Sequence, residues 1–311
     1  MKVNKIYIYG ALMAVAAHLL WSCGPDRPEE TKPDFALSAR VQSLDYNGSS
    51  IWGNQAELGV FVTKPGSTSI TEGNENKRYT TIFQTKATRL SAVEEKISLP
   101  ENGGLADIHI YYPYYKEITL TDNSKAVYNV DLKNQEERMP EMLLAGKQEN
   151  CSATINSATV SLKPVFSKLN VRVKNEHTTK SSAEDIRLQL TGIPCKAEID
   201  ILTTTYQAYG ELESTEMTRP ENSIYAYEAI LLAHEVSEDA RLKVIFPESS
   251  SIKEQEISLA EHIAKFDQNC QYDMAITVTD GGINAVLISI SDFSVSEWYE
   301  DSEDIFGNIN N

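Results

Sequence analysis

The sequence is poor in cysteine and lacks the motifs that mark common catalytic, metal and cofactor sites. It has four cysteines, and no two of them are spaced as Cys-x-x-Cys, so a zinc or dithiol site has no support. His-Glu-x-x-His, Gly-x-Ser-x-Gly, Walker and Gly-x-Gly-x-x-Gly patterns are also missing. The sequence therefore predicts no catalytic residue, no metal and no cofactor. A glycoside hydrolase stays open as an alternative, because it needs only two well-placed carboxylates.

Positive charge is also scarce. The chain has 28 Lys and Arg against 45 Asp and Glu, a formal net charge of −17. Such an excess of acid repels nucleic acid phosphates and anionic lipid headgroups. We therefore expect no nucleic acid partner, and we interpret the charge as a source of solubility in an exposed compartment.

The first residues form a leader that ends at a cysteine. Two lysines precede an apolar run at 6–20, which is shorter than the roughly 20 residues that a spanning helix needs. A membrane anchor is the less favoured alternative. Leu20 and Ser22 stand three and one residues before Cys23, a spacing that resembles a lipobox. The sequence predicts a signal peptide over 1–22, lipid attachment at Cys23, and anchoring to the outer membrane.

Lipid on Cys23 would leave three cysteines, Cys151, Cys195 and Cys270. An odd number permits at most one disulfide, and the sequence leaves the pair undetermined.

Apolar residues recur with a period of two. This alternation is typical of strands with one buried and one wet face. The clearest segments are 58–62, 169–173, 186–190, 242–246 and 272–278. Short strands between turn residues favour an all-β fold of sandwiches. Asp280-Gly281-Gly282 predicts a hairpin turn, and a capping box at Ser258–Glu261 predicts one or two helical turns.

A domain boundary is expected near Pro164, which cannot donate to a central ladder. An alternative boundary lies in the polar stretch 174–182. The first choice divides the chain into a leader, an acidic proline-rich tether, two β domains and an acidic tail: 1–22, 23–34, 35–163, 164–298 and 299–311.

Several polar and aromatic residues are candidates for a functional site. His109 alternates with apolar neighbours and is expected to be a solvated strand histidine, and Asp107 an isolated surface carboxylate. The cluster 111–115, Tyr-Tyr-Pro-Tyr-Tyr, favours alternate tyrosines in the core with hydroxyls at the rim. Its alternative is a sugar-stacking platform.

Six stretches, in order, resemble the fimbrillin family of Bacteroidetes, the two-domain lipoproteins that build or cap type V pili. They are Ile51-Trp52-Gly53 with 58–62, Ile110–Tyr114, Met142–Gly146, 160–171, Tyr272–Val278 and Ile290 to Trp298. The resemblance spans 35–298 and implies two transthyretin-like β-sandwiches in tandem. It also implies a shaft, anchor or tip subunit that assembles with other pilus subunits, with a surface ligand if it is an adhesin.

The resemblance further implies assembly by strand donation. A sandwich that lacks one strand exposes ladder groups and an apolar groove, which a segment from a neighbour fills. Arg40 is the expected protease cleavage position, although it also fits an ordinary polar residue of the first strand. The expected donor segment carries Leu287, Ile288, Ile290, Phe293 and Val295. The alternative function is a surface-tethered glycan-binding lipoprotein that uses Tyr114 and Tyr115.

Overall fold

The computed structural model describes residues 35–41, 55–83, 88–137, 140–175, 186–219, 226–247, 252–280 and 286–298. The chain divides into two compact units, Met1–Phe35 and Ala36–Asn311, and all described residues except Phe35 belong to the second. The predicted signal peptide, Cys23, the tether, the Gly281-Gly282 turn and the acidic tail lie outside the described residues.

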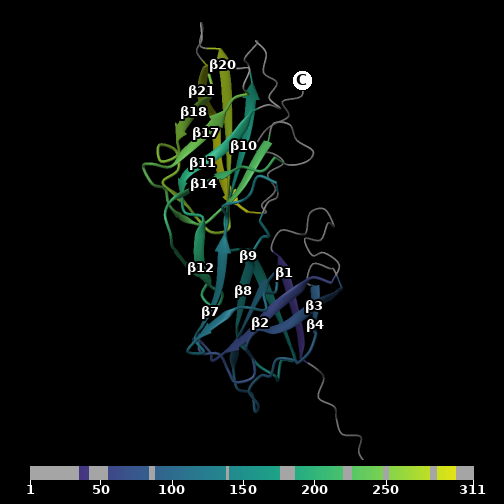
Figure 1. Ribbon diagram of the computed structural model, residues 1–311. Helices are drawn as coiled ribbons and strands as arrows, with labels where there is room; N and C mark the ends of the chain where they lie inside the picture. Colours follow the sequence, from purple (N-terminus) through teal and green to yellow (C-terminus); the bar gives the residue numbers. More distant parts are fainter. Residues whose placement is uncertain are drawn as a thin grey trace, which may run out of the picture. The chain divides into compact units, whose positions relative to one another are not determined.

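Seven strands form a closed ring, seen in purple to teal in Figure 1. They are β1 (Ala36–Val41), β2 (Glu57–Thr63), β3 (Lys77–Phe83), β4 (Thr88–Ala92), β5 (Ala106–Tyr112), β8 (Leu144–Cys151) and β9 (Ser157–Pro164). The order is β1-β4-β3-β2-β5-β8-β9. The ring closes because β1 pairs antiparallel with β4 and parallel with β9.

Alternation explains the ring's interior. In β9, residues 158, 160, 162 and 164 are buried, and the residues between them are exposed or half-buried. β2 and β5 differ, because residues 58–63 and 106–111 are buried without alternation. A strand buried on both faces must be covered on its outer side by another layer.

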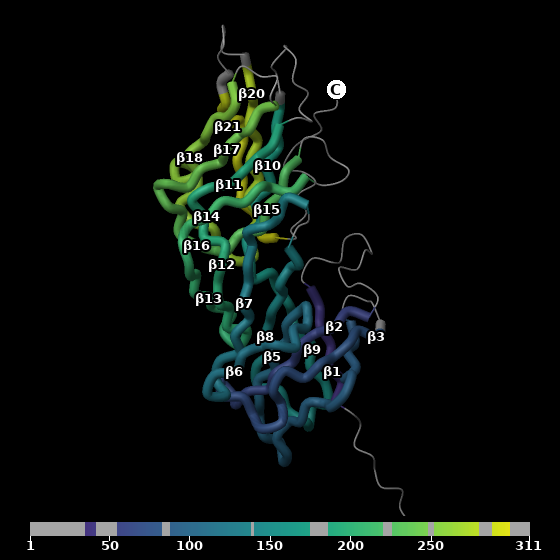
Figure 2. The backbone as a smooth tube through the Cα atoms, viewed as in Figure 1, coloured from purple at the N-terminus to yellow at the C-terminus, as the bar shows by residue number. Residues whose placement is uncertain are grey.

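That second layer is a sheet with strand order β13-β12-β7-β6. Its strands are β6 (Thr119–Thr121), β7 (Lys125–Asp131), β12 (Lys196–Asp200) and β13 (Thr205–Ala208). Phe61 and Tyr111 of the ring share one apolar cluster with Ile199 and Leu202 from β12 and the turn after it. Figure 2 traces β12 beside β7, with which it pairs antiparallel. Residues far beyond Pro164 thus cover the ring, while Pro164 itself ends β9.

The later strands form a β-sandwich of two four-stranded sheets. One has the order β15-β10-β20-β21 and the other β14-β11-β17-β18. Their bounds are β10 (Ser167–Asn175), β11 (Arg187–Ile193), β14 (Glu213–Glu216), β15 (Ala226–Leu231), β17 (Arg241–Ile245), β18 (Glu254–Ser258), β20 (Cys270–Asp280) and β21 (Val286–Glu297). A short pair, β16 (His234–Glu235) and β19 (Lys265–Phe266), lies beside them. Leu169, Leu188, Leu242 and Met274, one from each of four strands, meet in a single core.

One buried glutamine joins the segment after β7 to the sandwich. The Gln135 side chain accepts from Ile230 N at 2.9 Å and donates to Ile230 O at 2.8 Å. It also donates to Leu132 O at 2.8 Å. Because its amide pairs with both backbone groups of Ile230, Gln135 acts as a strand residue would at the edge of β15. Its side chain has no exposed surface.

The all-β class is confirmed, and the predicted strands 58–62, 169–173, 186–190, 242–246 and 272–278 are all present. The expected helical segment is a single turn, in which Ile263 N donates to Leu259 O at 2.8 Å. The described part of the chain contains no helix, and thus no helix that is long and apolar enough to cross a membrane.

Candidate strand-exchange site

β1 occupies the gap between β4 and β9. Its register with β9 runs without interruption from Ala36↔Ser157 to Val41↔Leu162. Among the described residues it pairs with β4 at Ser38 and Ala39, and the residues just before Thr88 lie outside the described ranges.

The inward face of β1 is a row of small and medium apolar side chains. Leu37, Ala39 and Val41 are 2%, 0% and 4% exposed. Ala158, Val160 and Leu162 of β9 alternate in the same way and are equally buried. A strand with this pattern in β1's place would bury the same apolar surface and satisfy the same backbone groups.

Arg40 projects from the outer face of β1 and is exposed. Its Nε donates to Ser161 Oγ at 2.8 Å. A cut after Arg40 would separate Ala36–Arg40 from the rest of the chain and leave only Val41 of β1. The side chain is accessible, but its peptide bond lies in a paired strand, so a protease requires this part of β1 to open locally.

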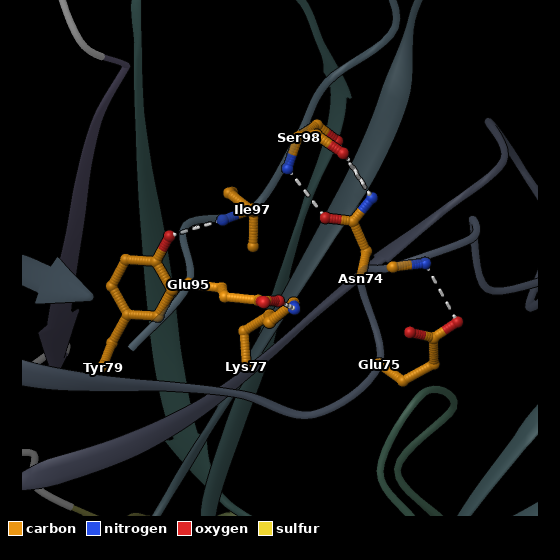
Figure 3. Close-up of polar contacts among 8 residues, drawn as sticks. Asn74, Glu75, Lys77, Tyr79, Glu95, Ile97 and Ser98 are labelled. Atoms are coloured by element: carbon orange, nitrogen blue, oxygen red, sulfur yellow. Dashed lines mark hydrogen bonds and ion pairs between the residues drawn. The ribbon is translucent and has the colours of Figure 1, made fainter. Parts of the chain in front are cut away.

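β4 has supports that do not involve β1 (Figure 3). The segment after β4 is fixed by Asn74, whose side chain accepts from Ser98 N at 2.8 Å and donates to Ser98 O at 3.0 Å. Asn74 is 1% exposed. Tyr79 Oη accepts from Ile97 N at 2.8 Å, and Lys77 pairs with Glu95 beside it. This wall of the groove should therefore persist without β1.

The opposite wall depends on β1. β9 pairs with β8 only at Leu144↔Pro164 and Ala145↔Lys163. Residues 157–162 consequently have β1 as their one ladder partner. Removal of β1 would leave these residues unpaired on both edges, held only by their buried apolar side chains.

β21, which carries the expected donor residues, is an edge strand. It pairs with β20 from Cys270↔Glu297 to Asp280↔Val286, with a register shift opposite Ala275 and Ile276. Ile288, Ile290 and Phe293 pack against the sandwich core, whereas Val295 is 51% exposed. The backbone of Leu287 pairs with Thr279, and its side chain lies outside the described residues. β21 is therefore engaged within its own chain.

The expectation for His109 is wrong, because this histidine is buried at 2% exposure. One ring nitrogen, Nε2, lies 3.0 Å from Thr63 Oγ1, and the ring also bonds the backbone of Leu202. Burial lowers the pKa of His109 to about 4. The turn after β12 covers this outer face of β5, which no local pattern reveals.

Asp107 is likewise not a surface carboxylate, since it is 1% exposed. Its Oδ2 accepts from Gly66 N and its Oδ1 from Asn150 N, both at 2.9 Å. The carboxylate thus joins the turn after β2 to the end of β8. It is a structural group and not a reactive one.

The tyrosine cluster divides between core and surface. Tyr111 is fully buried, and its hydroxyl donates to Asn76 Oδ1 at 2.8 Å, in agreement with the prediction of a core tyrosine. Tyr115 is 39% exposed and its ring meets Tyr128 at 5.2 Å with a 60° tilt. The Arg78 guanidinium lies 5.7 Å from the Tyr114 ring. Each of these two rings thus contacts a neighbouring side chain.

The three cysteines are free thiols. Cys151 and Cys195 are buried, and burial raises the pKa of Cys195 to about 11, which suppresses the reactive thiolate. No group of His, Cys, Asp and Glu in the described ranges is arranged to hold a metal ion.

The family model of fimbrillin-like proteins matches residues 40–298. The chain belongs to this fimbrillin-like family, and the match begins at Arg40. No curated protein matches the chain at a significant level.

Solved structures share its fold. A candidate cell adhesion protein from Bacteroides uniformis has a TM-score of 0.68 at 21% identity, over 86% of this chain and 99% of that one. A second candidate cell adhesion protein, from Bacteroides ovatus, has a TM-score of 0.63 at 13% identity, over 85% and 96%. The C-terminally truncated tip fimbrial protein Mfa3 from Porphyromonas gingivalis has a TM-score of 0.51 at 9% identity, over 86% and 100%.

Proposed function

We propose that this protein is a non-enzymatic fimbrial subunit or surface adhesin, exported as a lipoprotein through Cys23 and assembled with other pilus subunits by strand donation. Family membership supports the class. The observation that carries the assembly mechanism is β1, a strand with an alternating apolar face that another strand could replace, and with an exposed Arg40 near its end.

In this proposal the structure is the closed form, before assembly. β1 fills its own groove and β21 pairs with its own β20. Removing β1 would expose apolar surface worth about 1.5–3 kcal/mol for a side chain such as Leu37 or Val41, together with the ladder groups of β9. An incoming strand with alternating apolar residues would bury that apolar surface again and would pair with the ladder groups of β9. β21 supplies such a row in Ile288, Ile290, Phe293 and Val295, provided that it leaves β20.

The test treats the mature chain, Cys23–Asn311, with an arginine-specific protease. The new N-terminus is identified by mass and the products are viewed by electron microscopy. Cleavage after Arg40 followed by fibres is the expected result. The matched control is Arg40→Lys, which keeps the positive charge but removes the cleavage specificity, and it should stay monomeric. Fibres from the uncut control would contradict the cleavage step. A wild type that resists the protease and stays monomeric would exclude a shaft role.

Membrane anchoring is tested separately. Cys23→Ser should move the protein from the membrane to the soluble fraction, because serine lacks the thiol that would carry the lipid and the acyl chains supply the anchoring. An unchanged distribution would contradict lipid attachment at this residue.

A further inference from the structure

A pocket of about 700 Å³ with both polar and apolar lining lies on the outer face of the ring. Its floor is formed by β5, β8 and β9, which contribute His109, Lys147, Ser161 and Lys163. The remaining wall comes from the turns 201–204 and 268–269 and from Glu297. Neither Arg40 cleavage nor strand donation assigns a role to this pocket.

Strand register gathers cations on the floor. Lys147 lies opposite the outward-facing His109, and Lys163 lies opposite Ala145, two residues from Lys147. Arg40 lies opposite Ser161 and bonds its hydroxyl at 2.8 Å. Lys163 is the diagonal neighbour of both Lys147 and Arg40, at a spacing of about 7–8 Å. Lys147 and Lys163 line the pocket and Arg40 lies beside it, on one face of a chain whose net charge is −17.

The carboxylates nearby neutralise this cluster only in part. Lys147 pairs with Glu149 at 2.7 Å, and Glu297 lines the outer wall. Asp107 is bound by two backbone amides. Lys163 is exposed and has no carboxylate partner within the described ranges, so its ammonium is available to an anion.

The other wall offers hydroxyls and amides in fixed positions. Gln268 Nε2 donates to Thr204 O at 2.7 Å and ties the two turns together. Thr203 Oγ1 bonds Asp200 Oδ2 at 3.0 Å. With Ser67 and Thr68 from the turn after β2, this wall provides short donors and acceptors that suit the hydroxyls of a sugar. No aromatic ring other than the buried His109 lines the pocket.

We propose that this pocket binds a carboxylated saccharide, with the sugar's carboxylate at Lys163 and Lys147 and its hydroxyls on the turns 203–204 and 268–269. The hydroxyls of Ser67, Thr68 and Thr203 around the pocket favour a polyhydroxylated ligand over an acidic peptide, and the comparison ligands below separate the two. The site is separate from the Tyr114 and Tyr115 surface.

The test measures binding of trigalacturonic acid to the mature chain by isothermal titration calorimetry at low salt. Trigalacturonic acid should bind, and its methyl ester, which has the same hydroxyls but no charge, should bind at least tenfold more weakly. Lys163→Gln should weaken binding about tenfold, because a charge-assisted hydrogen bond is lost. Lys116→Gln, an exposed lysine elsewhere, should have no effect. Added salt should weaken binding of the wild type.

Comparison ligands separate the sources of a carboxylate. Acetate and a triglutamate peptide should each bind much more weakly than trigalacturonic acid. Equal binding of the ester, of acetate or of the peptide would overturn the proposal, as would unchanged affinity in Lys163→Gln or no binding at all. Lys147→Gln is the second variant if Lys163→Gln loses its wild-type thermal transition. None of these outcomes depends on fibre formation, so the result is independent of the assembly mechanism.

Discussion

Acidification should destabilise this protein through one buried histidine. Burial and, to a smaller extent, nearby Lys147 lower the pKa of His109 from 6.5 to about 4, against the opposing effect of Asp107 and Asp200. The pKa in the folded state lies below that in the unfolded state. The unfolded chain therefore binds more protons once the pH falls below about 6.5. The stabilising effect of the neutral ring is complete above that pH and is lost as the pH falls towards 4.

The size of the loss follows from the pKa difference. The shift of 6.5 − 4 = 2.5 units corresponds to about 3 kcal/mol when fully expressed, at about 1.4 kcal/mol per unit. By pH 5 the loss is about 2 kcal/mol, because the unfolded imidazole is then almost fully protonated and the folded one is not. This is a large part of a typical total stability of about 5–15 kcal/mol.

The assay compares urea unfolding at pH 7 and pH 5 for the wild type and for His109→Gln. Glutamine does not titrate, and it can accept from Thr63 and donate to Leu202. Every other titrating group is common to the two proteins, so the difference between their pH dependences isolates the histidine. The wild type should lose about 2 kcal/mol more than the variant between the two pH values. Equal losses would refute the reasoning.

Three further predictions concern packing, the connecting glutamine and the thiols. Gly59→Ala should cost about 3 kcal/mol of unfolding free energy, because a Cβ there would lie 1.9 Å from the Tyr111 ring; a change below 1 kcal/mol by urea denaturation would contradict this. Gln135→Leu should cost about 2–4 kcal/mol, since it leaves both backbone groups of Ile230 unpaired at that point, and an unchanged thermal transition would argue against it. Cys195 should react with a maleimide only after unfolding, because burial raises the pKa of its thiol to about 11; rapid labelling of the folded chain, followed by mass spectrometry, would show that the thiol is accessible.

Local alternation was enough to predict the strands of the sandwich. Leu169 and Val171 are separated by one polar residue, as are Leu242 and Val244, and the two members of each pair are buried on the same face. Such a pattern has the period of a strand and of no other regular structure. The cover sheet is harder to predict, because β12 is short and its partner β7 lies some 70 residues earlier.

The polar residues show where local reasoning fails. His109 and Asp107 alternate with apolar residues as surface residues do, yet both are buried. Asn74 lies in a loop of ordinary polar composition, and its role appears only when Ser98 is brought beside it. Burial of a polar side chain depends on which distant backbone groups satisfy it, and one sequence does not reveal them.

The sequence by itself determined the all-β class, the positions of most strands and the resemblance to the fimbrillin family, because strand periodicity and family motifs are local properties of the chain. Tertiary structure alone decided that β1 closes a ring between β4 and β9, that the turn after β12 buries His109, and that Lys147 and Lys163 line one pocket. Those arrangements depend on register between strands distant in sequence, where shifting the pairing by one residue would turn each side chain to the opposite face.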